Sequence, residues 1–253
     1  MIVCVGLATR DTIYAVPQHP AADGRVVATE RAVAGGGPAA TAAVAIARLG
    51  VEARFVGVID GELEGVEVMH RPGRMVESTI LVGGGTRAII TTEAEPFDVS
   101  RASLEGAEWV HVDHVGYRSL RPLLDEVSGR SRVSVDGSNP IPELSLEGVD
   151  LYAPSEKTDD GRRAKLTVVT KGERGCTAYT ADETIEVPGS PVDAISTLGA
   201  GDVFHGALLA CLSRGLPLRD SLFRANACAA LSCRALDGRS AIPTWQELEA
   251  SVA

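Results

Sequence analysis

The sequence is poor in aromatic residues and in positive charge. Aromatic residues make up 4% of its 253 residues, and 24 Lys and Arg stand against 34 Asp and Glu, for a formal net charge of −10. This balance argues against nucleic acid or an anionic membrane as a partner, because both need a net or clustered positive field. No apolar run approaches the roughly 18 residues of a membrane span, and the opening stretch MIVCVGLATRD lacks a basic signal-peptide start. We therefore expect a small-molecule partner, no nucleic acid and no membrane.

Cysteine usage excludes two further classes of protein. The five cysteines are odd in number, lie in apolar surroundings and form no CxxC pair. Neither a disulfide framework nor a structural zinc site is expected, and the pattern fits a reducing cytoplasm.

The remaining composition, 45% hydrophobic and 23% charged, indicates a single globular domain over residues 1–253. Continuous apolar runs indicate strands buried on both faces, as in a parallel sheet covered by helices. Several of them alternate with helical patterns, so the predicted class is α/β. Strands are predicted at Ile2–Ala8, Phe55–Ile59, Trp109–Val112, Val133–Val135, Leu151–Ala153 and Leu166–Thr170, and helices at Pro38–Leu49, Ser119–Val127, Val203–Arg214, Leu218–Leu236 and Thr244–Val252.

Two regions depart from this alternation. Met75–Val82 and Thr86–Thr92 flank three glycines, which is the pattern of a β-hairpin, and Gly24–Val33 also alternates and is predicted to pair beside it. Together they predict a small antiparallel lid, formed by segments 24–33 and 72–95, that either covers a site or is only an edge hairpin. The junctions near 60–65 and 155–165 are too short for a crossover with a helix, so either these crossovers are irregular or residues are missing there.

The stretch STLGAGDVFHGAL carries the clearest chemistry. Gly199 and Gly201 let backbone N–H groups approach a ligand, and the helix predicted to begin near Asp202 points its positive end at the same place. This geometry favours an anion, and in phosphoryl transfer Asp202 would accept the proton of an attacking hydroxyl. We expect Asp202 to be ionised at neutral pH, because both its reference pKa and the helix terminus favour the carboxylate. The alternative is simple helix capping by Asp202.

Two other nucleotide motifs are absent. A dinucleotide fingerprint would need glycine at Phe204, and the Gly-Lys pair of a Walker A loop does not occur in the sequence.

The stretch STLGAGDVFHGAL resembles the carboxy-terminal signature of the ribokinase-like (PfkB) carbohydrate kinases, and AGGGPAATAAVAIARLG, at Ala34–Gly50, resembles their amino-terminal glycine signature. The resemblance extends over the chain through GLATRD, VVTKGERGC and DGRSAIP, and its motifs are most similar to those of the sulfofructose kinase branch. It implies a doubly wound, mostly parallel sheet flanked by helices, with a small antiparallel β-flap as lid.

The resemblance also implies roles for individual residues. Asp202 matches the catalytic base and Gly199, Ala200 and Gly201 the backbone anion hole. On the substrate side, Gly36 and Gly37 match the glycine pair of the sugar site and Asp11 the aspartate that binds sugar hydroxyls. On the nucleotide side the matching residues are Thr170, Gly172 and Gly175. ATP and Mg²⁺ are the implied cofactors.

The sequence departs from the family at two cofactor positions. Ser196 replaces an aspartate that helps to hold a monovalent cation, so the family's potassium site is altered. Ser155–Thr158 replaces an NxxE pattern, which leaves Glu156 as the candidate for organising Mg²⁺ and its waters.

Several polar residues have two readings each. Asp113 and His114 end a predicted strand, where ligands bind in open α/β sheets, and Asp113 is a candidate substrate contact. Arg87 either reaches a substrate anion from the lid or guards an edge strand. Asp136 is a nucleotide-side candidate or a loop cap, and His205 faces the catalytic turn or the neighbours of its helix. His111 and His114 lack a third ligand, so no protein metal site is predicted.

The predicted function is transfer of the γ-phosphoryl group of ATP to a hydroxyl of a sugar or sugar-like substrate. The alternatives are a nucleoside kinase on the same scaffold, which the scarcity of aromatic residues for base stacking disfavours, and a non-catalytic sugar-binding or regulatory protein. An exposed hairpin edge in the lid also predicts a homodimer formed through the β-flap.

Overall fold

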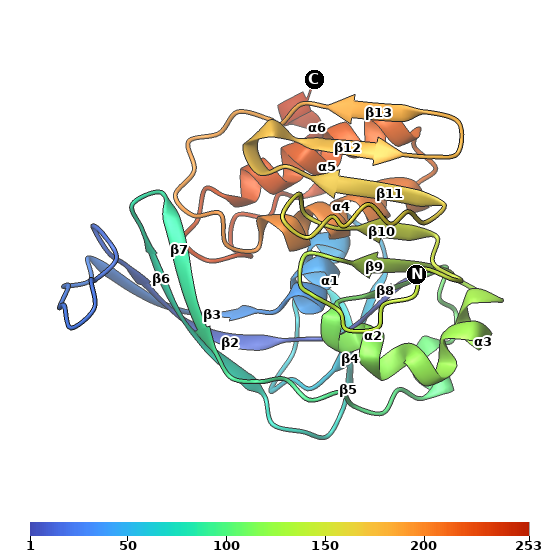
Figure 1. Ribbon diagram of the computed structural model, residues 1–253, viewed down its shortest axis with the longest axis horizontal. Coiled ribbons are helices and arrows are strands. Elements are labelled where there is room, and N and C mark those ends of the chain that lie inside the picture. Colours follow the sequence, from blue (N-terminus) through green and yellow to red (C-terminus); the bar gives the residue numbers. More distant parts are fainter. Residues whose placement is uncertain (253) are drawn as a thin grey trace.

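A large mixed sheet forms the body of the molecule in the computed structural model, which describes residues 1–252 (Figure 1). Its strands are β1 (Ile2–Val5), β4 (Ala53–Gly57), β5 (Val66–His70), β8 (Trp109–Val112), β9 (Arg132–Asp136), β10 (Leu151–Ala153), β11 (Leu166–Thr170), β12 (Cys176–Tyr179) and β13 (Thr184–Val187). They lie in the order β13-β12-β11-β10-β9-β8-β1-β4-β5. Neighbours from β11 to β5 are parallel, whereas β12 and β13 are antiparallel additions.

Helices cover both faces of this sheet. On one face lie α1 (Pro38–Arg48), α4 (Ala200–Ser213), α5 (Leu218–Ser232) and α6 (Trp245–Val252), which form the larger core with Ile2, Phe55 and Trp109. On the other face, α2 (His114–Leu120) and α3 (Leu124–Ser128) pack against Val3 and Val110. Short 3-10 turns occur at Arg101–Leu104, Arg121–Leu123 and Gly172–Arg174. The predicted doubly wound α/β architecture is therefore confirmed.

Helix starts differ from the prediction at two places. The helix predicted over Ser119–Val127 begins earlier, as α2, because Asp113 caps its amino terminus. Helix α4 begins at Ala200 rather than near Asp202, because Gly199 adopts the left-handed conformation (φ 74°) and serves as the N-cap.

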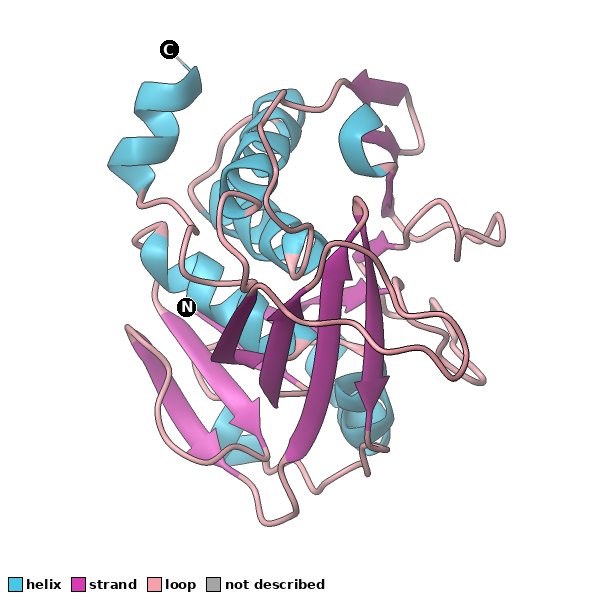
Figure 2. Ribbon diagram, turned by 90° about the vertical axis from the view of Figure 1, so that its left-hand side faces the viewer, coloured by secondary structure: helices cyan, strands magenta, loops and turns pink. Residues whose placement is uncertain are grey.

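The smaller sheet forms the lid, which projects from the body beyond the carboxyl ends of the parallel strands (Figures 1 and 2). It contains β2 (Thr9–Ala15), β3 (Glu30–Gly36), β6 (Val76–Gly83) and β7 (Thr86–Thr91) in the order β3-β2-β6-β7. The hairpin β6–β7 and the pair β2–β3 are antiparallel, whereas β2 and β6 are parallel. The lid is therefore mixed and not purely antiparallel.

The lid also differs in extent from the predicted segments. The predicted strand Gly24–Val33 is displaced to β3, and β2 lies between it and the hairpin. The predicted first strand, Ile2–Ala8, ends as β1 at Val5, and the chain leaves the large sheet to enter the lid at Thr9. The change of sheet could not be predicted, because the residues from Ile2 to Ala8 form one apolar run.

The two short junctions close without helices. Residues 58–65 connect the parallel neighbours β4 and β5, and residues 154–165 connect β10 and β11, through turns and bends alone. Both crossovers are irregular over the residues present, and the two predicted alternatives stay open.

Two further properties concern the described chain as a whole. Among the helices of residues 1–252, none is both long and apolar enough to traverse a membrane. All five cysteines are buried as free thiols, and burial raises the pKa of Cys176 and of Cys211 to about 11.

Candidate active site

The order of the strands reverses between β1 and β8, and the turn that begins α4 lies near the carboxyl end of this region. In an open α/β sheet such a switch point is where ligands bind. Gly199 caps α4, and its conformation leaves no room for a side chain, because a Cβ there would lie 2.9 Å from the Cα of Gly238. A Cβ on Gly201 would meet nothing within 4 Å. The amino terminus of α4 therefore faces open space, where its N–H groups can bind an anion.

Asp202 lies in the first turn of α4, half-buried. Its pKa is raised to about 7, first by burial and then by the negative charge of Asp136. The charge of His205 opposes this rise, Asp113 adds to it, and Arg87 opposes it. The expectation of full ionisation at neutral pH is therefore wrong, because burial and two carboxylates outweigh the helix dipole. A pKa near the working pH suits a general base.

Asp11 and Gly36 lie together on the inner side of the lid. Burial raises the pKa of Asp11, against the opposing influence of Thr9, Arg239 and Ser78. One of its carboxylate oxygens, Oδ1, is buried without a hydrogen-bond partner among the described residues. A Cβ on Gly36 would lie 2.0 Å from the other oxygen, so glycine is needed for Asp11 to occupy its place. An unpaired buried oxygen of this kind fits a ligand hydroxyl as its missing donor.

Gly37 has a different role at the same junction. It is the N-cap of α1, with φ of 92°, and a Cβ there would lie 2.4 Å from the carbonyl oxygen of Leu7. The residue therefore permits the sharp passage from lid strand β3 into α1 close to the backbone after β1.

Asp113 is fully occupied by backbone donors. Its Oδ1 accepts from the N–H groups of Val115 and Gly116, and its Oδ2 accepts from those of Leu7 at 2.7 Å and Ala39 at 3.2 Å. The side chain is 0% exposed. This arrangement favours a structural role that joins the end of β1 to α1 and α2, over the predicted substrate contact.

Two arginines bring positive charge to the site. Arg87, on lid strand β7, donates to the hydroxyl of Thr197 at 2.8 Å, just before the Gly199 turn. Arg239 donates to the Thr41 hydroxyl and to the carbonyl of Gly36. Burial lowers the pKa of Arg239 to about 10, although Asp11 and Asp202 both oppose this. Arg239 is not among the residues predicted from the sequence, where its only signal is its place in the stretch DGRSAIP.

The nucleotide-side candidates form a separate group after β11. The backbone N–H of Glu156 donates to the carbonyl of Thr170 at 2.8 Å, and the Glu156 carboxylate pairs with Arg174 at the surface. The side-chain hydrogen bond from Arg174 is the main cause that lowers the pKa of Glu156. Gly172 and Gly175 have φ of 60° and 86° on either side of the 3-10 turn. Thr170, Gly172 and Gly175 thus lie at the end of β11 and the turn after it, and Glu156 contacts them from the connection between β10 and β11.

Within residues 1–252, no group of three or more His, Cys, Asp or Glu side chains is arranged to hold a metal ion.

The chain is similar in sequence to known carbohydrate kinases. Residues 153–245 match the model of the pfkB family of carbohydrate kinases. Ribokinase from Bacillus subtilis is 23% identical over 286 residues, covering 98% of each chain. Because this alignment is longer than the 253-residue chain, the relative has segments that this chain lacks. A probable chloroplastic fructokinase from Arabidopsis thaliana is 39% identical over 89 residues, which is 32% of this chain and 23% of that protein.

Solved structures show the same fold. Ribokinase from Arabidopsis thaliana, in complex with ribose and ATP, superposes with a TM-score of 0.78 at 20% identity and covers 98% of this chain and 96% of its own. Nucleoside kinase from Burkholderia thailandensis, in complex with inosine, gives a TM-score of 0.79 at 17% identity, with 99% and 97% covered. The signature motifs, the full-length relatives and the shared fold all make the chain similar to the ribokinase-like PfkB carbohydrate kinases.

Proposed function

We propose that the chain transfers the γ-phosphoryl group of ATP to a hydroxyl of a sugar or sugar-like substrate, with Asp202 as base. The observation that carries this proposal is the position of Asp202, a carboxylate with a pKa of about 7 in the first turn of a helix whose amino terminus is open beside Gly201. The relatives support the same chemistry, since they are named as ribokinases, fructokinases and an ATP-dependent ribose-1-phosphate kinase.

The proposed step is an in-line displacement. The substrate hydroxyl lies between Asp202 and the γ-phosphate, and the Asp202 carboxylate takes its proton as the oxygen–phosphorus bond forms. The bond from phosphorus to the bridging oxygen breaks, and its electron pair leaves with ADP. Backbone N–H groups of Gly199, Ala200 and Gly201 stabilise the charge on the transferred group.

Apart from Asp113, the remaining predicted residues are assigned to positions around this step. Asp11, with its unpartnered oxygen, accepts a substrate hydroxyl, while Gly36 and Gly37 hold the lid strand against it. Arg87 closes the lid over the acceptor and faces the transferred charge. Thr170, Gly172 and Gly175 line the nucleotide side. Glu156, whose carboxylate pairs with Arg174 in this structure, would be the residue that holds Mg²⁺, a hard cation that would balance phosphate charge.

Ser196 does not offer the carboxylate that a monovalent cation would need. Its hydroxyl accepts from the N–H of Leu198 at 3.2 Å, and the side chain is buried. We therefore propose turnover without dependence on potassium. The free thiols fit a cytoplasmic enzyme.

The experiment that tests the function is ADP release from Mg-ATP across ribose, fructose, other ketoses and aldoses, a sulfonated hexose and nucleosides. The wild-type chain is compared with Asp202→Asn and with Asp182→Asn, an exposed aspartate in the turn between β12 and β13. We expect one substrate class to turn over, with a loss of about 10³-fold in Asp202→Asn alone. Full turnover in Asp202→Asn would disprove the base role, and sugar binding without turnover would favour the non-catalytic alternative.

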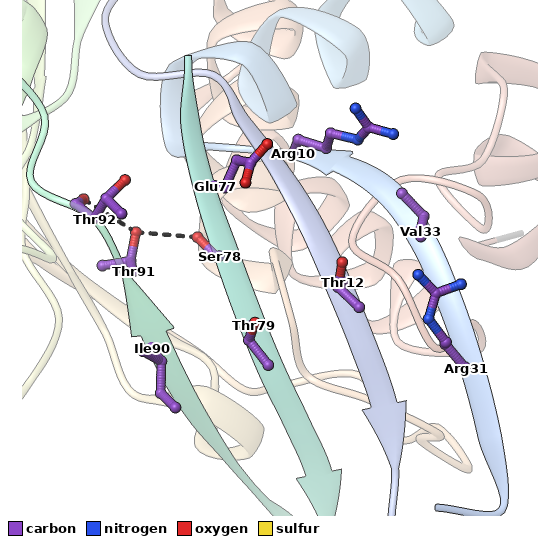
Figure 3. A pocket seen from close by; sticks show the side chains of 10 residues that line it. All are labelled: Arg10, Thr12, Arg31, Val33, Glu77, Ser78, Thr79, Ile90, Thr91 and Thr92. Atoms are coloured by element: carbon purple, nitrogen blue, oxygen red, sulfur yellow. Dashed lines mark hydrogen bonds between the residues drawn. The ribbon is translucent and has the colours of Figure 1, made fainter. Parts of the chain in front are cut away.

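We also propose that two copies associate through their lids. Ile90 and Val33 are 70% and 46% exposed on the outer side of the lid, and β7 is an exposed edge strand. Arg10, Arg31 and Glu77 surround a hollow of about 400 Å³ on this surface (Figure 3). A two-fold related copy would place opposite charges against each other around an apolar centre. Light scattering should give a dimer for the wild type and a monomer for Ile90→Glu; a wild-type monomer at micromolar concentration would refute it.

A further inference from the structure

Three polar side chains lie buried between α4 and the large sheet, and two of them act electrostatically on the candidate base Asp202. They are His205 on α4, Asp136 at the end of β9 and His111 on β8, with exposed fractions of 2%, 1% and 1%. His205 Nδ1 lies 3.3 Å from Asp136 Oδ2, and the rings of His111 and His205 are 5.8 Å apart between centroids. Burial of a charged pair in an otherwise aliphatic core costs desolvation free energy, so the pair is not explained by stability alone.

The charge states of the three groups follow from their surroundings. Burial and the neighbouring His205 lower the pKa of His111 to about 3, so this ring is neutral and contacts the Ser134 hydroxyl through Nδ1. Burial alone would lower the pKa of His205, but Asp136, and then Asp202, reverse this and raise it. Burial would raise the pKa of Asp136, but the neighbouring His205, 3.3 Å away, lowers it. The 3.3 Å separation and the raised pKa of His205 favour an imidazolium beside a carboxylate, although neither ring nitrogen of His205 has a hydrogen-bond partner among the described residues.

His205 follows Asp202 by three residues and so lies on the same side of α4, one turn further along the helix. Five ionisable groups act on Asp202: the carboxylates of Asp136 and Asp113, the ring of His205, and the guanidinium groups of Arg87 and Arg239. Arg87 belongs to the lid, and Arg239 is engaged by Gly36 and Thr41. His205 is the cation fixed in the same helix as the base, so its effect does not depend on lid closure.

We propose that His205 is a positioning residue for phosphoryl transfer, whose imidazolium, held by Asp136, offsets the negative field of Asp136 and Asp113 on Asp202. The inference rests on the proposed function, in which Asp202 takes the proton of the acceptor. The charges of His205 and Asp136 nearly cancel at Asp202. Removal of the His205 charge alone would therefore raise the pKa of Asp202.

This arrangement predicts a shifted pH dependence for His205→Gln alone, and little change for Asp136→Asn or for the double variant. His205→Gln removes the positive charge and leaves the Asp136 carboxylate beside the base, so the acid limb of kcat/KM moves to higher pH, by about one pH unit. Asp136→Asn removes the carboxylate and also the reason for His205 to hold its proton, so both charges disappear and the limb moves little. The double variant Asp136→Asn/His205→Gln likewise restores the limb to within about 0.3 pH unit of the wild type.

The experiment uses the full chain, Mg-ATP and the acceptor found in the substrate panel, with kcat/KM measured from pH 5 to 9. The variants are His205→Gln, Asp136→Asn, the double variant and Asp202→Asn, with His70→Gln on edge strand β5 as the histidine control. Imidazole ¹⁵N shifts of the wild type at pH 7, assigned through His205→Gln, report the protonation of His205 without reference to turnover. Thermal stability is measured for every variant.

We expect the His205 ring to be charged at pH 7 and the acid limb of the kcat/KM profile to lie at higher pH in His205→Gln. In the double variant, both the acid limb and the thermal stability should return to the wild-type values. A neutral His205 ring at pH 7 would overturn the inference. An unmoved limb in a folded His205→Gln variant would reduce the pair to a structural feature, and a double variant as shifted as His205→Gln would also refute charge balance. Should Asp202→Asn keep full turnover, the proposed function fails instead, whatever the ¹⁵N shifts report.

Discussion

The Arg87 guanidinium on lid strand β7 donates a hydrogen bond of 2.8 Å to the hydroxyl of Thr197, and a longer one to the Thr197 carbonyl. Thr197 lies two residues before Gly199, the N-cap of the helix that carries Asp202. The lid is therefore in direct contact with the turn that forms the candidate anion hole, and its position and the geometry of that turn are linked.

Arg87→Met should lower kcat/KM by at least about tenfold, because it removes both the lid contact and a positive charge that favours ionisation of Asp202. Thr197→Val removes the hydrogen bond and keeps the charge, and we expect a loss of about threefold. Steady-state kinetics of both variants measure the two contributions. Equal losses in the two variants would mean that the contact alone matters, and wild-type activity in Arg87→Met would remove Arg87 from the site.

Gly201→Ala should leave the fold intact and reduce turnover. Its Cβ meets no atom within 4 Å, so the free energy of unfolding should stay within about 0.5 kcal/mol of the wild type, while the methyl group projects into space proposed for phosphate. Gly199→Ala serves as the comparison. Because Gly199 has a positive φ and lies close to the Gly238 backbone, this substitution should lower the free energy of unfolding by about 1–3 kcal/mol.

Urea denaturation and ADP release distinguish these two glycines. A Gly201→Ala variant with full activity would show that ligands do not approach this part of the turn.

Asp113→Asn should destabilise the protein by at least about 3 kcal/mol. The amide nitrogen of asparagine cannot accept from the two N–H donors that it would face, so buried donors lose their partner. Urea denaturation of Asp113→Asn beside Asp125→Asn, an exposed aspartate on α3, measures the effect. Unchanged stability with lost turnover would instead support the substrate contact predicted from the sequence.

Asp202→Asn should be more stable than the wild type at pH 8. Because the folded pKa of Asp202 is raised to about 7, the neutral carboxyl contributes stability at low pH that is lost as the pH rises through this value. Asparagine stays neutral, so the difference should be near zero at pH 3.5, grow up to pH 7 and then level off. We expect about 1–2 kcal/mol at the plateau, allowing for the partial solvent exposure of the side chain.

Urea titrations at pH 3.5, 5, 7 and 8 follow this difference. A variant less stable than the wild type at pH 8 would show that the Asp202 carboxylate is stabilised, and not strained, by its neighbours.

The features that could be predicted from the sequence are those encoded locally. Buried strands such as Trp109–Val112 are continuous apolar runs, and the Gly199–Asp202 turn is a short motif with its chemistry in adjacent residues. Strand β2 was missed because it directly continues the apolar start of the chain, although it pairs with β3 and β6 instead of the large sheet.

Long-range contacts explain the remaining differences in the site. The backbone partners of Asp113 include Leu7, which is 106 residues away in the sequence, and Arg239 reaches Gly36 across 203 residues. The pairing of His205 with Asp136 likewise depends on how α4 lies on β9. Such partners are set by topology and register, which no local pattern specifies.

The five buried thiols have a practical consequence for work on this protein. A thiol reagent reacts with the thiolate, so burial and a raised pKa protect the cysteines while the chain is folded. Each opening of the core exposes thiols to irreversible labelling, and mass spectrometry counts how many have reacted. Thiol labelling of the native cysteines thus measures the rate of unfolding, with Cys4 reporting on β1 and Cys228 on α5. No cysteine needs to be introduced.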